Sequence, residues 1–176
     1  MIIFMGVAGA GKSVQGRMIA DELALPWVST GEFLRMLVTG ERRREMLAGK
    51  LLEDTEIIAM ADRIFHMIDT KQEFILDGFP RTAPQADWLI AQHKAGLLTI
   101  SCVINLEAAE EVVAKRLMSR GRQDDTREAI KKRFAEYKAV TLPIIKKLEN
   151  SGVSVHHVEA DHTPSEVHDM IVPILK

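Results

Sequence analysis

The chain has 176 residues and a formal net charge of −2, from 23 Lys and Arg against 25 Asp and Glu. This length predicts a single domain, residues 1–176, folded around one core. The near-neutral charge argues against a general nucleic-acid-binding protein. The single cysteine, Cys102, excludes an internal disulfide and a multi-cysteine zinc site, and its apolar neighbours predict a buried strand position.

The sequence also argues against a membrane protein. No stretch approaches the ~20 consecutive apolar residues that a membrane span needs. The first residues lack the basic region that precedes the apolar part of a secretory leader. We therefore expect a soluble, cytoplasmic protein without a membrane partner.

The most specific local pattern lies near the N-terminus, where residues 6–13 read Gly-Val-Ala-Gly-Ala-Gly-Lys-Ser and fit G-x-x-x-x-G-K-[ST]. The apolar run Met1 to Met5 precedes it and predicts a strand. A helical pattern follows, with Val14, Met18, Ile19 and Leu23 on its apolar side. Strand, glycine-rich loop and helix together predict a phosphate-binding loop, in which Lys12 reaches the terminal phosphates and the Ser13 hydroxyl can hold Mg²⁺. The alternative is a glycine-rich turn that fits the pattern by chance.

The rest of the chain alternates between strand and helix patterns. Further strands are expected at 25–29, 73–76, 99–106 and 153–158. Helical patterns cover about 30–69, interrupted at Gly40 and Gly49, and then about 82–94, 105–120, 125–150 and 163 onward. This order predicts an α/β fold of the P-loop NTPase type with three layers, in which helices cover both faces of a five-stranded parallel sheet.

Local signals mark several helix ends. Asp125 and Glu128 can form a capping box, and Pro143 should kink the helix that begins there. Thr163-Pro164-Ser165-Glu166 combines a cap, a proline at the first helical position and a capping glutamate. The run Arg42-Arg43-Arg44 fits a solvated helix face better than a phosphate site.

Six arginines lie on segments that should meet at the carboxyl edge of the sheet: Arg35, Arg81, Arg116, Arg120, Arg122 and Arg133. Arg116 and Arg120 are four residues apart, so one helical face carries both. Singly, each fits an ordinary surface residue. Together they fit phosphoryl transfer, which needs two phosphates in line and their negative charge neutralised.

The sequence resembles the adenylate kinases of the nucleoside monophosphate kinase family over nearly its whole length. The resemblance rests on the phosphate loop, Ser29-Thr30-Gly31-Glu32-Phe33-Leu34-Arg35, Gly49-Lys50-Leu51, Asp77-Gly78-Phe79-Pro80-Arg81-Thr82 with Gln85, Arg116 to Arg120, and Arg122-Gln123-Asp124-Asp125 followed by Arg133. The Asp-Gly-Phe-Pro-Arg motif is specific to this family. The resemblance implies reversible transfer of the ATP γ-phosphate to AMP, giving two ADP, as a step in nucleotide biosynthesis.

The resemblance also implies residue roles. ATP would be held by Gly9, Ala10, Gly11, Lys12, Ser13, Arg116 and Arg120. AMP would be held by Thr30, Arg35, Gly78, Arg81 and Gln85. The catalytic set would be Lys12, Arg81, Arg116, Arg120, Arg122 and Arg133. Ser13 and Asp77 would hold the Mg²⁺ that accompanies ATP, partly through water, and no zinc is expected.

Three alternatives stay open. Gln85 lies three residues after Thr82 and could close a capping box, although its amide can also read the hydrogen-bonding edge of adenine. A UMP/CMP-type kinase is disfavoured because, by resemblance, those enzymes tend to carry Ala and Asn where this chain has Thr30 and Gln85. A non-catalytic nucleotide-binding regulator on the same fold is disfavoured by the full set of Lys12 and arginines.

Two segments are shorter than is usual in the family. Only Gly121 separates Arg120 from Arg122, so we expect a very short lid loop at about 120–125 in place of a long insertion. The helical AMP-binding subregion, at about 30–59, is also short, and it carries Glu32 where the family usually has Asp. These features leave a monomer or a small homo-oligomer open.

Overall fold

The computed structural model describes residues 1–47, 52–122 and 125–176. Two stretches of the resemblance, Gly49-Lys50-Leu51 and Gln123-Asp124, lie outside the described residues. The lid loop that the sequence predicts at 120–125 is therefore described in part.

A five-stranded parallel sheet forms the centre of the fold. Its strands are β1 (Ile2–Gly6), β2 (Trp27–Ser29), β3 (Ile75–Asp77), β4 (Cys102–Glu107) and β5 (Val155–Glu159), in the spatial order β2-β3-β1-β4-β5. Every paired neighbour is parallel. This confirms the predicted fold class, because parallel neighbours need crossover helices to join them.

Helices connect the strands. They are α1 (Lys12–Leu23), α2 (Thr30–Leu37), α3 (Gly40–Leu47), α4 (Asp54–Met67), α5 (Ala83–Lys94), α6 (Glu110–Arg120), α7 (Arg127–Glu136), the π-helical turn η1 (Tyr137–Thr141), α8 (Leu142–Asn150) and α9 (Pro164–Leu175). The helical segment is interrupted between α2 and α3, and α3 begins at Gly40, where the sequence predicts an interruption. None of the helices in the described part of the chain is long and apolar enough to cross a membrane.

The core has two layers, one on each face of the sheet. Ile3, Leu76 and Val103 pack on one face against α4, α5 and α8. Phe4 and Ile104 pack on the other face against α1, α6, α7 and α9. Successive strand residues alternate between the layers, so a strand buried on both sides has a continuously apolar sequence.

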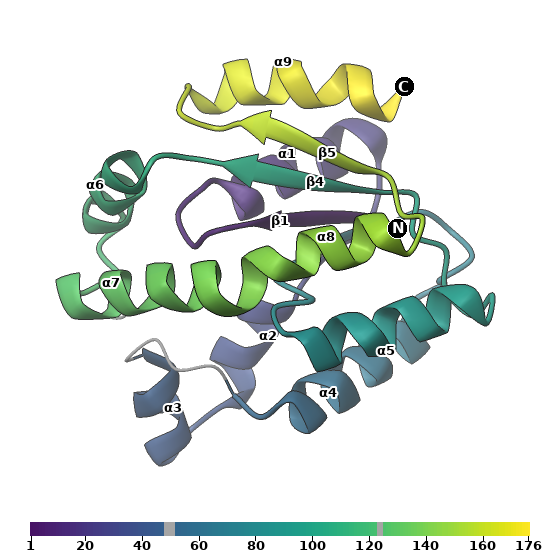
Figure 1. The fold of residues 1–176 in the computed structure, drawn as a ribbon, viewed down its shortest axis with the longest axis horizontal. Coiled ribbons are helices and arrows are strands. Elements are labelled where there is room, and N and C mark those ends of the chain that lie inside the picture. Colours follow the sequence, from purple (N-terminus) through teal and green to yellow (C-terminus); the bar gives the residue numbers. More distant parts are fainter. Residues whose placement is uncertain (48–51, 123–124) are drawn as a thin grey trace.

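All of the strands end on the same side of the molecule. In Figure 1 the arrowheads of β4 and β5 point toward the side where α6 and α7 lie, and α3 lies across from α7. The loops that follow β1, β2 and β3 emerge at this same carboxyl edge, where parallel α/β sheets bind their ligands.

Strand positions are confirmed, but the strands begin later than predicted. Phe74, Ile100 and Val153 are buried in the core, yet they precede the β3, β4 and β5 ladders. Apolar burial therefore extends beyond the hydrogen-bonded strand, and hydrophobicity alone cannot mark the boundary.

The predicted apolar side of α1 is partly wrong. Val14 is 49% exposed and Leu23 is 38% exposed, whereas Gln15 and Gly16 are buried together with Ile19. Gly16 allows the close approach of this helix to β2, because a Cβ at this position would lie 2.9 Å from the indole Nε1 of Trp27. The helix therefore packs through its small residues, which a search for large apolar side chains misses.

Two of the predicted helix ends have different outcomes. Thr163 and Glu166 form the expected capping box at the start of α9, with Pro164 as the first helical residue. The capping box predicted at Asp125 is wrong, because Thr126 caps α7 by accepting a hydrogen bond from the Ala129 N–H.

The long helical segment after Thr126 changes geometry ahead of Pro143. It runs through α7 and α8 with the π-helical turn η1 between them. Pro143 has no N–H to donate to the preceding turn, and a wider turn is one way in which a helix adapts to that loss. The kink predicted at Pro143 corresponds to the π-helical turn η1, which ends two residues before this proline.

Candidate active site

The loop between β1 and α1 has the backbone that a phosphate-binding loop requires. Gly9 has φ +90° and Gly11, the N-cap of α1, has φ +109°. A Cβ on Gly9 would lie 2.8 Å from side-chain carbons of Val113 and Leu117. The loop therefore lies directly against α6, and the positive end of the α1 dipole is next to the loop.

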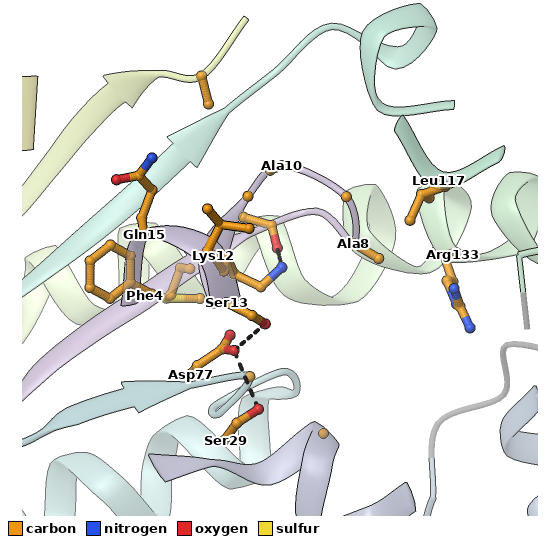
Figure 2. Close-up of a pocket in the computed structure, with 18 of the residues that line it drawn as sticks. Phe4, Ala8, Ala10, Lys12, Ser13, Gln15, Ser29, Asp77, Leu117 and Arg133 are labelled. Carbon is orange, nitrogen blue, oxygen red and sulfur yellow. Dashed lines mark hydrogen bonds between the residues drawn. The ribbon is translucent and has the colours of Figure 1, made fainter. Parts of the chain in front are cut away.

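Lys12 turns back over this loop. Its ammonium donates to the carbonyl oxygens of Gly6 (2.8 Å) and Val7 (2.9 Å), and Figure 2 shows Lys12 with one of these two bonds. Burial lowers the pKa of Lys12 from 10.5 to about 8; the charge of Asp77 opposes this, and nearby arginines add to it. The amine is thus held by neutral carbonyls in a crowded positive region.

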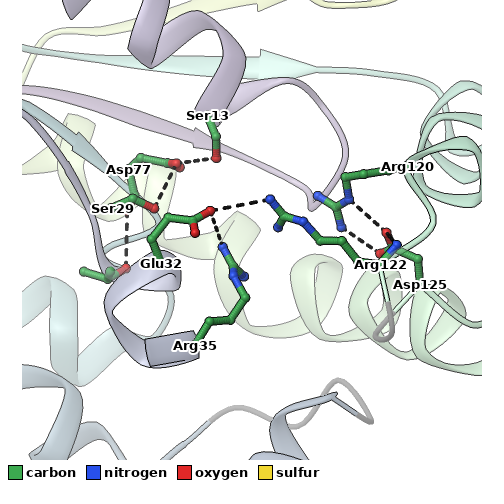
Figure 3. A network of polar contacts seen from close by, with 9 residues as sticks. Ser13, Ser29, Glu32, Arg35, Asp77, Arg120, Arg122 and Asp125 are labelled. Carbon is green, nitrogen blue, oxygen red and sulfur yellow. Dashed lines mark hydrogen bonds and ion pairs between the residues drawn. The ribbon is translucent and has the colours of Figure 1, made fainter. Parts of the chain in front are cut away.

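Ser13, at the start of α1, lies beside Ser29 and Asp77, which are the last residues of β2 and β3. The Ser13 hydroxyl donates to Asp77 Oδ2 at 2.5 Å and the Ser29 hydroxyl donates to the same oxygen at 3.3 Å (Figures 2 and 3). Hydroxyl and carboxylate oxygens are hard donors that suit Mg²⁺, which keeps several waters and needs only one or two carboxylates beside substrate phosphates. The donor set at Ser13 and Asp77 therefore fits a magnesium ion.

A cavity of about 700 Å³ opens beside this loop. Its volume is in the range of small-molecule binding sites. All six arginines singled out in the sequence line it, together with Lys12: Arg35, Arg81, Arg116, Arg120, Arg122 and Arg133. The predicted residues Gly9, Ala10, Gly11, Ser13, Asp77 and Gly78 line it as well. The convergence inferred from sequence spacing is confirmed.

Asp125 fixes two of these arginines. Its carboxylate accepts from Arg120 Nε (2.8 Å) and Nη2 (2.7 Å), and it pairs with Arg133 Nη1 at 3.3 Å. Burial acts to raise the pKa of Asp125, but the hydrogen bonds and charge of Arg120, followed by Arg122 and Arg133, hold it below its usual range. Asp125 joins α6 to α7 through these ion pairs, which explains why it does not cap α7.

Glu32 joins the two sides of the cavity. It accepts from Arg35 on its own helix at 2.8 Å and pairs with Arg122 from the lid loop at 3.5 Å (Figure 3). The hydrogen bond with Arg35 is the main cause that lowers the pKa of Glu32. A single long side chain, Arg122, thus reaches across from the short lid loop to α2.

Two of the predicted AMP-binding residues are buried instead of lining the cavity. Thr30 and Gln85 are each 2% exposed. Thr30 donates to the Asp77 carbonyl, and Gln85 accepts from the Arg81 N–H at 2.8 Å. The capping interpretation of Gln85 is wrong, because the amide bonds Arg81 in place of Thr82, and the Thr82 hydroxyl turns to Asp54.

Comparison with known proteins agrees with this geometry. The family model described as "Adenylate kinase" matches residues 4–153. The chain belongs to the adenylate kinase family.

Curated members of the adenylate kinase family resemble the chain over most of its length. The adenylate kinase of Corynebacterium aurimucosum is 34% identical over 173 residues, which is 95% of this chain and 94% of that relative. The adenylate kinase of Leptospira biflexa is 38% identical over 163 residues, 86% and 87% of the two chains. Adenylate kinase 1 of a Nostoc species is 37% identical over 150 residues, 82% of each.

Several residues that line the cavity are not among the site residues predicted from the sequence. Gln15, Glu136, Tyr137 and Thr141 line the cavity. Gln15 Nε2 donates to the Pro164 carbonyl, while its Oε1 is buried and finds no hydrogen-bond partner among the described residues. Gln15 could have been predicted from the sequence, because it is a polar residue in the first helical turn after the phosphate loop. Tyr137 and Thr141 lie on η1 and Glu136 is the last residue of α7 before it, and the π-helical turn has no sequence signature of its own.

We expect Asp125→Asn to lower the free energy of unfolding by about 2 kcal/mol at pH 7, because hydrogen bonds to charged partners are lost. Since the native pKa of Asp125 is lowered, its contribution is present above the unfolded value of about 4 and is lost as the pH falls through the native value. Urea denaturation at pH 7 and pH 3 should therefore show a smaller difference from the wild type at the lower pH.

The matched control is Asp87→Asn, which removes an exposed ion pair with Lys147 and should change stability by less than about 1 kcal/mol. Equal stability losses in the two variants would contradict the role assigned to Asp125.

Proposed function

We propose that the chain transfers the γ-phosphate of ATP to AMP in this cavity, reversibly, to give two ADP. Family membership supports the reaction, and one observation supports the site: eight Lys and Arg side chains, Arg17 of α1 among them, line a single cavity beside the phosphate loop, and they come from α1, α2, α6, α7, the lid loop and the loop after β3. The whole chain, residues 1–176, would act as one kinase domain, with the AMP-binding subregion at about 30–59.

On the ATP side, Gly9 to Ser13 would surround the β- and γ-phosphates with backbone N–H groups and with the positive end of α1. Arg116 and Arg120 would neutralise the same phosphates from α6. Arg116 Nη2 donates to the His162 carbonyl at 2.8 Å, which holds it beside the loop before α9. Ser13 and Asp77 would hold magnesium, which when bound would supply positive charge to the phosphates of ATP.

On the AMP side, Arg35 and Arg81 would bind the acceptor phosphate. Gly78 brings the backbone close to α2, since a Cβ there would lie 2.9 Å from Thr30 Oγ1. Gln85 would read adenine. Because the Gln85 side chain is buried, the base can meet its amide only after part of the covering wall moves aside.

The chemical step needs little covalent work from the protein. An oxygen of the AMP phosphate attacks the γ-phosphorus, and the bond from that phosphorus to the β-phosphate oxygen breaks, so the two oxygens must lie in line. Lys12, Arg81, Arg120 and Arg133 would hold that alignment. Together with Arg116 and Arg122 they would neutralise the charge that spreads over the transferring group.

Neither alternative has an observation in its favour. A pyrimidine acceptor would leave the buried amide of Gln85 without the adenine edge that it suits. A non-catalytic regulator would have no need to gather arginines on both sides of the position where a phosphate passes. A coupled assay that measures the ADP formed from ATP and AMP tests the proposal directly.

We expect Lys12→Ala and Arg81→Ala each to lower kcat by about a hundredfold, or about 3 kcal/mol, while the protein stays folded. Both side chains line the cavity. Circular dichroism and the coupled assay together measure this. Lys115→Ala and Arg63→Ala are matched controls, because both residues are exposed on helices. Wild-type turnover in either cavity variant would contradict the assignment.

We expect Gln85→Ala to weaken AMP binding by about tenfold or more and ATP binding by less than about twofold, because only the acceptor base meets this amide. Titration calorimetry with each nucleotide in turn measures both. An equal loss for AMP and ATP would mean that Gln85 only supports the Arg81 backbone.

A further inference from the structure

Asp54 connects the AMP-binding subregion to the loop that carries Arg81. It is the first residue of α4, and its Oδ1 accepts hydrogen bonds from Gln85 Nε2 (2.8 Å) and from the Thr82 hydroxyl. Gln85 and Thr82 lie about thirty positions further along the chain, at the start of α5. One carboxylate oxygen therefore fixes two side chains of a distant element.

The contacts of Gln85 specify the orientation of its amide. A carboxylate can only accept, so the NH₂ group of Gln85 must face Asp54. A backbone N–H can only donate, so the Gln85 carbonyl oxygen must face Arg81, with which it bonds at 2.8 Å. The reversed amide would place oxygen against carboxylate and NH₂ against N–H, so both partners oppose reversal.

The orientation of the Gln85 amide matters because its two possible orientations match opposite patterns of hydrogen-bond donors and acceptors on a base. Adenine presents an amino donor beside a ring-nitrogen acceptor, whereas hypoxanthine presents a carbonyl acceptor beside a ring N–H donor. The bonds to Asp54 and Arg81 use one N–H and one lone pair of Gln85, which leaves one of each for a base. A fixed amide suits adenine and meets hypoxanthine with like groups facing each other.

We infer that Asp54 is a positioning residue that sets the preference for an adenine acceptor, by holding the Gln85 amide in the orientation that adenine requires. The inference rests on the proposed function, in which Gln85 meets the base of AMP. Asp54 acts on the base through Gln85 and is not itself placed against substrate, while the Thr82 hydroxyl donates to the same carboxylate oxygen. Its carboxylate is the stronger of the two constraints, since a hydrogen bond to a charged acceptor exceeds one between neutral groups.

The test compares AMP with inosine monophosphate as acceptors at saturating ATP and Mg²⁺, for the wild type and Asp54→Asn. The introduced side-chain amide can donate as well as accept, so the reversed orientation of Gln85 is no longer opposed by a charge. We expect the ratio of kcat/KM for AMP to that for inosine monophosphate to fall by about tenfold. The loss for AMP should appear mainly in its KM, with the KM for ATP within about twofold of the wild type. The ratio does not depend on how much of the variant is folded, because both acceptors are measured on one preparation.

Three further variants test whether the effect is specific to the carboxylate of Asp54 and whether it acts through Gln85. Asp62→Asn makes the same change on the same helix, where Asp62 contacts His66, and should leave the ratio unchanged. Asp54→Glu keeps an acceptor-only carboxylate and should restore much of the ratio. In a Gln85→Ala background, Asp54→Asn should lower kcat/KM for AMP by less than about twofold, because a residue that acts through Gln85 has nothing left to position.

An unchanged ratio in Asp54→Asn would overturn the inference, and so would a full additional loss in the Gln85→Ala background. In both cases the wild type would still form ADP from ATP and AMP, and the proposed function would stand. A wild type that forms no ADP would overturn the proposed function itself.

Discussion

Repulsion between like charges is the constraint on which the site depends. Lys12 and seven arginines line one cavity of about 700 Å³ in a chain whose net charge is −2. Unpaired charges this close together in a partly buried region would be unstable. Burial is the main cause that lowers the pKa of Lys12 to about 8, and the nearby charges of Arg81, Arg120 and Arg133 also lower it. Phosphate groups would relieve the repulsion, so the same arrangement that costs stability favours a polyphosphate ligand.

The carboxylates that pair with these arginines differ in their burial and in the strength of their contacts. Asp125 is buried and binds Arg120 through two hydrogen bonds, so this pair is part of the fold. Glu32 is more exposed and makes a 3.5 Å contact with Arg122, so a phosphate could exchange with it at little cost. The rigid pairs keep the guanidinium groups in position, and the exposed pairs leave them accessible.

The sequence predicts most of the framework because its signals are local. The apolar runs locate all five strands, the phosphate loop follows from its glycines and Lys12, and the cap of α9 follows from Thr163 and Glu166. The set of converging arginines follows from the rule that parallel strands end at one edge. Family resemblance adds the assignment of the two nucleotides to the two sides of that edge.

The errors arise where tertiary contacts outweigh local preference. Asp125 has the right spacing for a cap, but two arginines bind it more strongly than a helix N-terminus would. Val14 is apolar but exposed, because α1 approaches β2 through Gly16. The orientation of the Gln85 amide depends on Asp54, which lies 31 positions away in the sequence.

In the proposed reaction, one cavity holds both nucleotides with their phosphates in line. Titration calorimetry with a bisubstrate analogue, two adenosines joined through five phosphates, is the most direct test of this arrangement. We expect one analogue to bind per chain, more tightly than ATP or AMP alone, and neither nucleotide to bind further to the saturated protein. A saturated protein that still bound AMP with unchanged affinity would contradict it, because the acceptor site would then lie elsewhere.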